Sequence, residues 1–189
     1  MQELLKRFQK SPVIPSAHSP ESVSRAAQTS AAAIFLLGGS ILTLPDMVRI
    51  AHENDKKAFV HLDLAEGLGR DDTAVHWCVE HAGADGIIST RPGLLKTASE
   101  LGAFTIQRLF LMDSTSFEHG KRMLRNTPPD MAEVLPGIAP KAIRQLCEAL
   151  NKPVIAGGLI TEPREIALAL QAGAAAVSVG DERLWNITI

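Results

Sequence analysis

The sequence predicts a (β/α)8 barrel of the TIM-barrel class, compact and with short loops, because eight apolar segments recur along the chain. They begin near residues 13, 32, 58, 85, 104, 131, 153 and 175, roughly 20 to 27 residues apart, with helix-compatible sequence between most of them. Buried parallel strands have such continuous apolar runs because both faces of the sheet are covered. The chain has 189 residues, slightly under the usual lower limit of about 200, which excludes large insertions. An open doubly wound sheet is the main alternative, and eight countable units argue against it.

The composition indicates a single domain over residues 1–189 with a substantial apolar core. Hydrophobic residues make up 46% of the chain and the formal net charge is -2, so nothing marks a strongly basic nucleic-acid-binding protein. Cys78 and Cys147 lack the spacing of a disulfide framework, a redox pair or a zinc site, which is typical of a reducing cytoplasm. The longest apolar run, AAAIFLLGGSILTL, is too short to span a bilayer, so we expect no membrane segment.

Several helix boundaries can be predicted in chain order. Ser19-Pro20-Glu21 should begin the first helix, with a capping hydroxyl, a proline of preset φ and an acidic first turn. Thr161-Glu162-Pro163 should begin the helix after the seventh strand. Three glycines each end a helical stretch before a strand, where a left-handed residue costs least: Gly83, Gly102 and Gly173. Only DERLWNITI follows the last strand, so the last helix must be very short.

Small or polar residues follow the apolar runs, at the strand ends where α/β proteins bind their ligands. The candidate ligand-binding residues are Asp63, Arg91, Arg108, Glu133, Gly157, Gly158 and Gly180. In barrels of this class, the loops after the seventh and eighth strands commonly bind phosphate through backbone N–H groups, and the three glycines end those strands. Tight turns are the alternative reason for the same glycines. We therefore predict a phosphate-binding ligand site at this end of the barrel.

The charged candidates suggest how such a ligand would be held. His61 and Asp63 are two residues apart on the predicted third strand, so they share a face. We expect Asp63 to hold ligand hydroxyls and His61 to be a core histidine with satisfied hydrogen bonds; metal binding is the alternative, although no third ligand stands out. Arg108 inside the fifth strand needs a partner, and we predict that it is Glu133, in a ligand-binding or a purely structural ion pair. Arg91 lies in a turn near the ligand end, where it can assist phosphate binding.

The predicted interior suits holding a small polyol phosphate better than transforming one. A Schiff-base aldolase needs a lysine buried on a strand, whereas Lys57 opens the third strand at the opposite end. Glu133 and Asp63 are the evident carboxylates for proton transfer, and an adjacent Arg108 would keep Glu133 ionised. Two alternatives stay open: a phosphosugar isomerase, epimerase or lyase with one of these carboxylates as base, and a metal-dependent phosphodiester hydrolase that also uses His61.

Five segments of the chain resemble the glycerol-3-phosphate-responsive antiterminators: HLDL, GIISTR, QRLFLMD, EVLPG and PVIAGG. The resemblance extends from about Pro12 to Trp185, and its most specific part is QRLF at 107–110 together with EVLPG at 133–137. It implies a barrel-like fold without catalytic residues or a cofactor. Such a protein senses glycerol 3-phosphate and acts on leader mRNA, so that transcription of glycerol-utilisation genes continues through a terminator. The RNA role follows from the resemblance and not from composition.

Two basic clusters are compatible with RNA binding: Lys6, Arg7 and Lys10 near the start, and Lys121, Arg122 and Arg125 on the helix after the fifth strand. Solvated helix faces explain both clusters equally well. Aromatic residues make up 4% of the chain and tyrosine is absent, which leaves few stacking platforms for bases. A homodimer would enlarge a cationic face, but the sequence contains no interface pattern.

Overall fold

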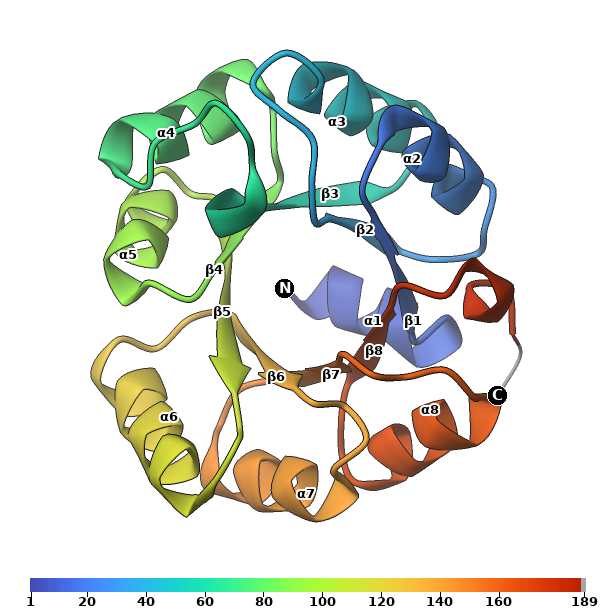
Figure 1. Cartoon of the computed structure of the whole chain (residues 1–189), viewed down its shortest axis with the longest axis vertical. Coiled ribbons are helices and arrows are strands. Elements are labelled where there is room, and N and C mark those ends of the chain that lie inside the picture. Colours follow the sequence, from blue (N-terminus) through green and yellow to red (C-terminus); the bar gives the residue numbers. More distant parts are fainter. Residues whose placement is uncertain (188–189) are drawn as a thin grey trace.

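The eight apolar segments form one closed barrel of parallel strands in the computed structural model, which describes residues 1–187 (Figure 1). The strands are β1 (Val13–Ala17), β2 (Ala33–Leu36), β3 (Lys57–His61), β4 (Gly86–Ser89), β5 (Phe104–Phe110), β6 (Met131–Leu135), β7 (Val154–Gly157) and β8 (Ala176–Val179). Sequence neighbours are barrel neighbours, and β8 pairs with β1 to close the ring. Each strand begins within one residue of its expected start, so the (β/α)8 prediction is confirmed.

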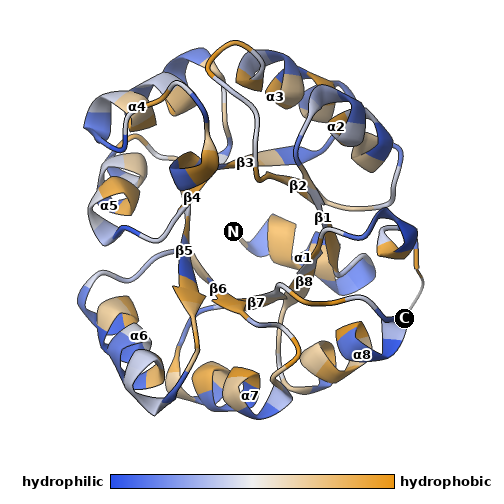
Figure 2. Cartoon of the chain, in the orientation of Figure 1, coloured by the Kyte–Doolittle hydropathy of each residue, from blue (hydrophilic) through white to orange (hydrophobic). Residues whose placement is uncertain are grey.

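An α-helix follows each of the first seven strands and covers the outside of the barrel (Figure 1). These helices are α2 (Pro20–Ala27), α3 (Leu44–Glu53), α4 (Asp72–His76), α5 (Pro92–Glu100), α6 (Ser114–Asn126), α7 (Pro140–Ala149) and α8 (Pro163–Gln171). α4 continues as the π-helical turn η2 (Trp77–His81), and β8 is followed only by the short turn η3 (Glu182–Leu184), as expected. Figure 2 shows apolar residues of the helix ring facing the strands. Within residues 1–187, no helix combines the length and apolarity that crossing a bilayer requires.

A helix before the first strand corrects the expectation that the first helix begins at Ser19. This helix, α1 (Gln2–Lys10), lies across the end of the barrel at which the strands begin, behind the strands in Figure 1. Its Leu4 and Phe8 side chains are buried in the barrel interior, and the Arg7 guanidinium donates to the Asp55 carbonyl oxygen at 2.6 Å. α1 therefore closes this end, which we call the base. The opposite end, where the strands finish, is the mouth.

The predicted helix boundaries have the expected local chemistry. Ser19 caps α2, because its hydroxyl accepts from the Ser22 N–H at 3.3 Å while the Ser22 hydroxyl accepts from the Ser19 N–H at 3.0 Å. At the start of α8, the Glu165 carboxylate accepts from the N–H groups of Thr161 and Glu162 at 2.7 and 3.0 Å. The three glycines that end helices have left-handed φ values of 75°, 77° and 106° at Gly83, Gly102 and Gly173. These short, well-capped connections hold the strand ends in register.

Candidate functional site

The barrel interior changes from apolar to polar as the strands approach the mouth. Alternate residues of a strand point to the same side, so residue pairs two apart line the interior one above the other. Each of these pairs has an apolar residue first and a polar residue or glycine second: Ile14/Ser16, Phe59/His61, Ile106/Arg108, Met131/Glu133, Ile155/Gly157 and Ala176/Ser178. The first members form one cluster with Leu4 and Phe8 of α1. The second members form a polar floor beneath the mouth.

An ion pair and a hydroxyl occupy the centre of this polar floor. Arg108 and Glu133 are register partners on β5 and β6, and Arg108 Nε donates to Glu133 Oε2 at 2.6 Å, which confirms the predicted pair. The Ser178 hydroxyl of β8 donates to Glu133 Oε1 at 2.7 Å. The two charged side chains are 7% and 1% exposed, so both charges depend on these contacts for their solvation. A Cβ at Gly157 would lie 2.8 Å from Glu133 Oε1 and would collide with the Ser178 hydroxyl, so this position requires glycine.

A cavity of about 310 Å³ opens above the floor, between β1, β5, β6, β7 and β8. Arg108, Glu133, Gly158, Ser178 and Gly180 are among its lining residues. Arg108 donates only through Nε, and its two terminal nitrogens make no hydrogen bond to residues 1–187. The Gly158 and Gly180 N–H groups likewise have no protein acceptor in this part of the chain. The mouth cavity thus combines a cation and open amide donors, which is the chemistry that binds a phosphate group.

The backbone beside this cavity is strained. Gly158 has a φ of +79°, and the next residue, Leu159, has a φ of +60° although it carries a side chain. A left-handed non-glycine residue costs on the order of 1–2 kcal/mol and is kept where surrounding structure or function requires it. The Leu159 side chain is 70% exposed, so burial of its own side chain does not compensate the strain. Glycine adopts such a φ without penalty, so the strain lies at Leu159, and strain of this kind is typical of functional loops.

Asp63 does not lie on the third strand, which corrects the sequence prediction. β3 ends at His61, and Asp63 belongs to the turn η1 (Leu62–Leu64). One carboxylate oxygen, Oδ2, accepts from the Ser89 hydroxyl at 2.9 Å and from the Thr90 N–H at 2.8 Å, at the end of β4. Asp63 therefore fastens η1 to the neighbouring strand end. Its other oxygen, Oδ1, is buried and makes no hydrogen bond within residues 1–187; it lies 3.5 Å from Arg91 Nε.

Arg91 lies apart from the glycines with which we expected it to act. Its guanidinium is about half exposed and lines a separate cavity of about 490 Å³, together with Arg70, Asp72 and Lys96. Gly158 and Gly180 do not line that cavity. The cation that shares a cavity with these glycines is Arg108. The structure therefore separates the seven predicted residues into a group around Arg108 and a neighbouring pair, Asp63 and Arg91.

His61 is buried as expected, but its hydrogen bonds are not satisfied. The residue is 2% exposed, and neither ring nitrogen has a partner within residues 1–187. Nδ1 is 3.9 Å from Asp63 Oδ2, too far for a hydrogen bond. Burial and the nearby positive charge of Arg108 lower the pKa of His61 to about 4, so the ring is neutral. Residues 1–187 contain no cluster of three side chains that could hold a metal ion, which does not favour the metal alternatives.

Sequence reasoning missed two hydroxyl groups at the mouth. Ser16 of β1 and Ser178 of β8 both line the mouth cavity, and both interrupt otherwise apolar strands. A lone hydroxyl at an interior position of a buried strand is the signal that would have identified them, because a buried hydroxyl needs a partner.

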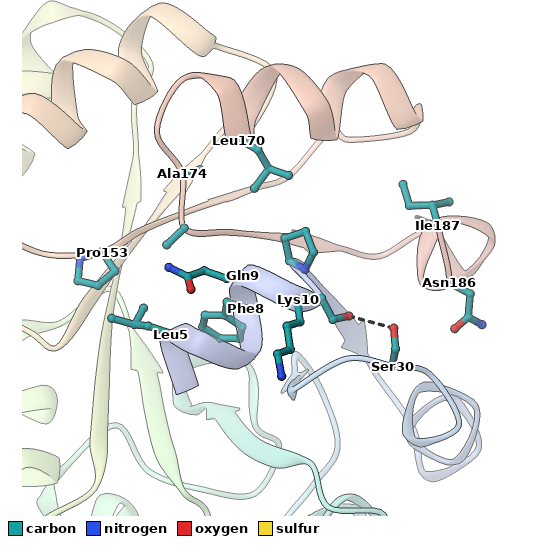
Figure 3. A pocket seen from close by; sticks show the side chains of 13 residues that line it. Leu5, Phe8, Gln9, Lys10, Ser30, Pro153, Leu170, Ala174, Asn186 and Ile187 are labelled. Atoms are coloured by element: carbon teal, nitrogen blue, oxygen red, sulfur yellow. Dashed lines mark hydrogen bonds between the residues drawn. The ribbon is translucent and has the colours of Figure 1, made fainter. Parts of the chain in front are cut away.

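A second and larger cavity lies at the base, between α1, α8 and residues 186–187 (Figure 3). Its volume is about 660 Å³. One side comes from α1, including Leu5 and Gln9, and the facing side comes from Leu170 and Ala174 (Figure 3). Lys10 is its one charged lining residue within the described chain. No sequence pattern predicted this base cavity, because its walls come from segments far apart in the chain.

Comparisons with known proteins agree with this geometry. A family model described as "Glycerol-3-phosphate responsive antiterminator" matches residues 13–185. The uncharacterized protein YgcP of Escherichia coli K12 is 34% identical over 97% of this chain and 96% of its own length. Barrel enzymes that are 14 to 18% identical share the fold alone.

Two solved structures are also similar. A glycerol uptake operon antiterminator regulatory protein from Listeria monocytogenes is 32% identical, with a TM-score of 0.89 over 94% of this chain and 96% of that one. A glycerol uptake operon antiterminator-related protein from Thermotoga maritima is 31% identical, with a TM-score of 0.82 over 93% and 98% of the two chains. By its sequence, its barrel and its relatives, the chain belongs to the glycerol-3-phosphate responsive antiterminators.

Proposed function

We propose that this protein binds glycerol 3-phosphate in the mouth cavity and, when occupied, acts on leader mRNA as a transcription antiterminator. The observation that carries the ligand assignment is the free donor capacity of Arg108, whose terminal nitrogens share one cavity with the open amides of Gly158 and Gly180. The RNA role is supported by family membership. An action on nascent transcripts places the protein in the cytoplasm, and the proposed role requires no cofactor.

Each end of the ligand has suitable partners in this arrangement. The phosphate would lie against the β7 and β8 loops, where the amides and the fork of Arg108 supply several donors to its oxygens. The hydroxyls would lie over the polar floor, where Glu133 and Ser178 can accept or donate. Gly157 makes room for this floor, and Asp63 holds the η1 turn and β4 in place beside it. A cavity of about 310 Å³ is at the lower end of the usual range of about 300–1,000 Å³ for small-molecule sites.

The interior does not favour a phosphosugar isomerase, epimerase or lyase. Glu133 is the carboxylate in the mouth cavity floor, where it is paired with Arg108 and accepts from Ser178. To act as a general base it would have to take up a proton and leave the buried Arg108 without its counter-charge. Turnover assays with triose and pentose phosphates test the enzymatic alternative directly. Activity that Glu133→Gln abolishes would replace the sensor proposal.

Titration calorimetry with glycerol 3-phosphate tests the ligand site. Arg108→Lys keeps the charge but loses the forked terminal nitrogens, so we expect binding to weaken roughly tenfold or more. Gly158→Asp places a carboxylate beside the phosphate and should also abolish binding. Arg91→Ala is the matched control from the neighbouring cavity and should leave the affinity unchanged. Loss of binding in Arg91→Ala with normal binding in Arg108→Lys would move the phosphate to the Arg91 side.

Regulation requires a difference between two states of the protein. Glycerol 3-phosphate must bind the RNA-competent state more tightly, and a useful switch needs a coupling of about 1–3 kcal/mol. Filter binding to a leader transcript of a glycerol-utilisation operon, with and without glycerol 3-phosphate, measures this coupling. Equal RNA affinity in both conditions would contradict ligand-responsive antitermination. Sedimentation in the same samples tests whether the protein forms a homodimer.

A further inference from the structure

The base of the barrel has a cavity whose lining suits a contact with nucleic acid. Within residues 1–187, a cation and no carboxylate line the base cavity, whereas carboxylates line both the mouth cavity and the cavity beside Arg91. Its polar lining groups are the exposed amides of Gln9 and Asn186 and the hydroxyls of Ser11 and Ser30, which lie 3.0 Å apart. Amide and hydroxyl side chains can form hydrogen bonds with the edges of unpaired bases.

Lys10 of α1 lines this cavity, and Lys6 lies one helical turn before it. Lys6 and Lys10 are exposed, and neither lies within salt-bridge distance of a carboxylate in residues 1–187. Arg7, the third cation of the predicted cluster, is instead used internally, because it binds the carbonyl oxygen and the carboxylate of Asp55. The N-terminal cluster therefore divides into one residue that anchors α1 and two that remain available to phosphates.

The other basic cluster has different surroundings. Lys121 of α6 lies 2.7 Å from Glu118 Oε1, and the neighbouring groove of about 360 Å³ is lined by Glu118 and Glu148. Two carboxylates at a groove repel a phosphate backbone, whereas the base cavity has none. Arg122 and Arg125 of α6 are exposed and unpaired within residues 1–187, as Lys6 and Lys10 are, so the lack of carboxylates around the base cavity is what favours α1 over α6 as the site of contact with a polyanion.

We propose that the base cavity receives an unpaired base of the leader RNA, with Lys6 and Lys10 contacting the flanking phosphates. The apolar part of the lining, which includes Leu5, Pro153 and Leu170, suits the face of a base, and Gln9 and Asn186 suit its edge (Figure 3). This inference rests on the proposed antiterminator function and adds the surface that meets the RNA. It places RNA and glycerol 3-phosphate at opposite ends of the barrel.

Contacts through the barrel interior connect these two ends. Leu4 and Phe8 of α1 pack in one cluster with Phe59, Ile106 and Met131. These three residues lie two positions before His61, Arg108 and Glu133 on their strands, directly beneath the polar floor. A ligand that rearranges the floor would therefore press on the layer against which α1 is packed. This gives the two-ended arrangement a physical route for regulation.

Fluorescence anisotropy with a fluorescein-labelled, random-sequence, 20-nucleotide single-stranded RNA tests the surface at several salt concentrations. In Lys6→Gln/Lys10→Gln, loss of two phosphate contacts should reduce the slope of log K against log salt by roughly 1.4 and weaken binding roughly tenfold near 0.1 M salt. Gln9→Ala/Asn186→Ala should weaken binding without changing that slope. Arg122→Gln/Arg125→Gln removes the same charge from α6 and should change the affinity by less than about twofold, since distant charges are screened.

The outcomes separate this inference from the proposed function. If the wild type binds the RNA and the α6 variant loses binding while the α1 variant does not, the surface is wrong and the antiterminator function stands. If a double-stranded RNA of the same length binds as tightly as the single strand, no unpaired base enters the cavity. If the wild type binds neither this RNA nor the leader transcript, the proposed function fails as well. Unchanged glycerol 3-phosphate affinity in the α1 variant shows that it is folded.

Discussion

The two ends of the barrel differ in how their buried groups are satisfied. At the mouth, the interior is polar, and three of the four buried side-chain atoms without a hydrogen-bond partner in residues 1–187 belong to His61 and Asp63. Strained backbone at Leu159 is also found there. At the base, Leu4 and Phe8 of α1 close an apolar interior.

This difference shows that the two ends contribute differently to stability. Buried polar atoms and left-handed residues lower stability and are typical of positions that a ligand or a mechanism requires. Apolar burial at the base has the opposite effect, because each large side chain removed from water stabilises the fold by about 1.5–3 kcal/mol. The mouth therefore carries a cost in stability, which its proposed ligand-binding role would explain and which the base and the outer helices offset.

Breaking the Arg108–Glu133 pair should have the largest effect. Arg108→Met leaves Glu133 buried with only the Ser178 hydroxyl as a partner, so the free energy of unfolding should fall by about 3–5 kcal/mol. Arg108→Met/Glu133→Leu removes both charges and should recover most of that stability, yet neither variant should bind glycerol 3-phosphate. Urea unfolding and calorimetry measure the two properties separately.

A matched change at the base sharpens the same comparison. Phe8→Ala removes a side chain that is 1% exposed and should also cost about 3–5 kcal/mol of unfolding free energy. In contrast to Arg108→Met, it removes no group that lines the mouth cavity, so the folded protein should still bind glycerol 3-phosphate. At the mouth, an Arg108→Met/Glu133→Leu variant that is as unstable as Arg108→Met alone would show that the ion pair itself stabilises the fold.

The sequence predicted the strands and one central contact because both depend on periodic patterns. Continuous apolar runs located the start of every strand to within one residue. The Arg108–Glu133 pair could be predicted because a buried cation requires an anion on a neighbouring strand. Each of these predictions uses residues that are close in the sequence or on adjacent strands.

The features that the sequence did not predict depend on distances in space between residues that are far apart in the chain. Asp63 falls just beyond β3 because the chain turns into η1, and this separates Arg91 from the β7 and β8 glycines. The role of α1 was missed because a short amphipathic helix gives no indication of which surface it covers. The base cavity is formed by segments around residues 9, 30, 153, 174 and 186, which meet only after the barrel has closed.

His61 predicts a stability loss in mild acid that comes from the mouth. The folded pKa of His61, about 4, is lower than the usual unfolded value of about 6.5, because burial and Arg108 disfavour the charged ring. Its contribution is therefore complete above about pH 6.5 and is lost as the pH falls towards 4, by about 3 kcal/mol in total. Arg108, whose charge disfavours the protonated ring, and Asp63, whose Oδ2 lies 3.9 Å from Nδ1, are the charged groups that act on His61.

Urea unfolding of wild type and His61→Gln between pH 7 and 4 measures this contribution. The variant should lose less stability over this interval, while substitution of an exposed histidine, His76→Gln, should reproduce the wild-type curve. Parallel curves for wild type and His61→Gln would mean that His61 is already paired in solution, for instance by an ordered water.

Relieving the strained backbone at the mouth should have the smallest effect and the opposite sign. Leu159→Gly removes a side chain that is 70% exposed from a residue with a φ of +60°, so little burial is lost while the left-handed penalty disappears. We expect the free energy of unfolding to rise by up to about 1 kcal/mol and the affinity for glycerol 3-phosphate to fall, because a more flexible β7 loop no longer holds its amides toward the phosphate. Thermal unfolding and calorimetry on the same sample measure both quantities. If Leu159→Gly gains stability and binds glycerol 3-phosphate as tightly as the wild type, the strain at residue 159 does not contribute to ligand binding. Leu159→Ala is the control, because it shortens the side chain but keeps the left-handed strain.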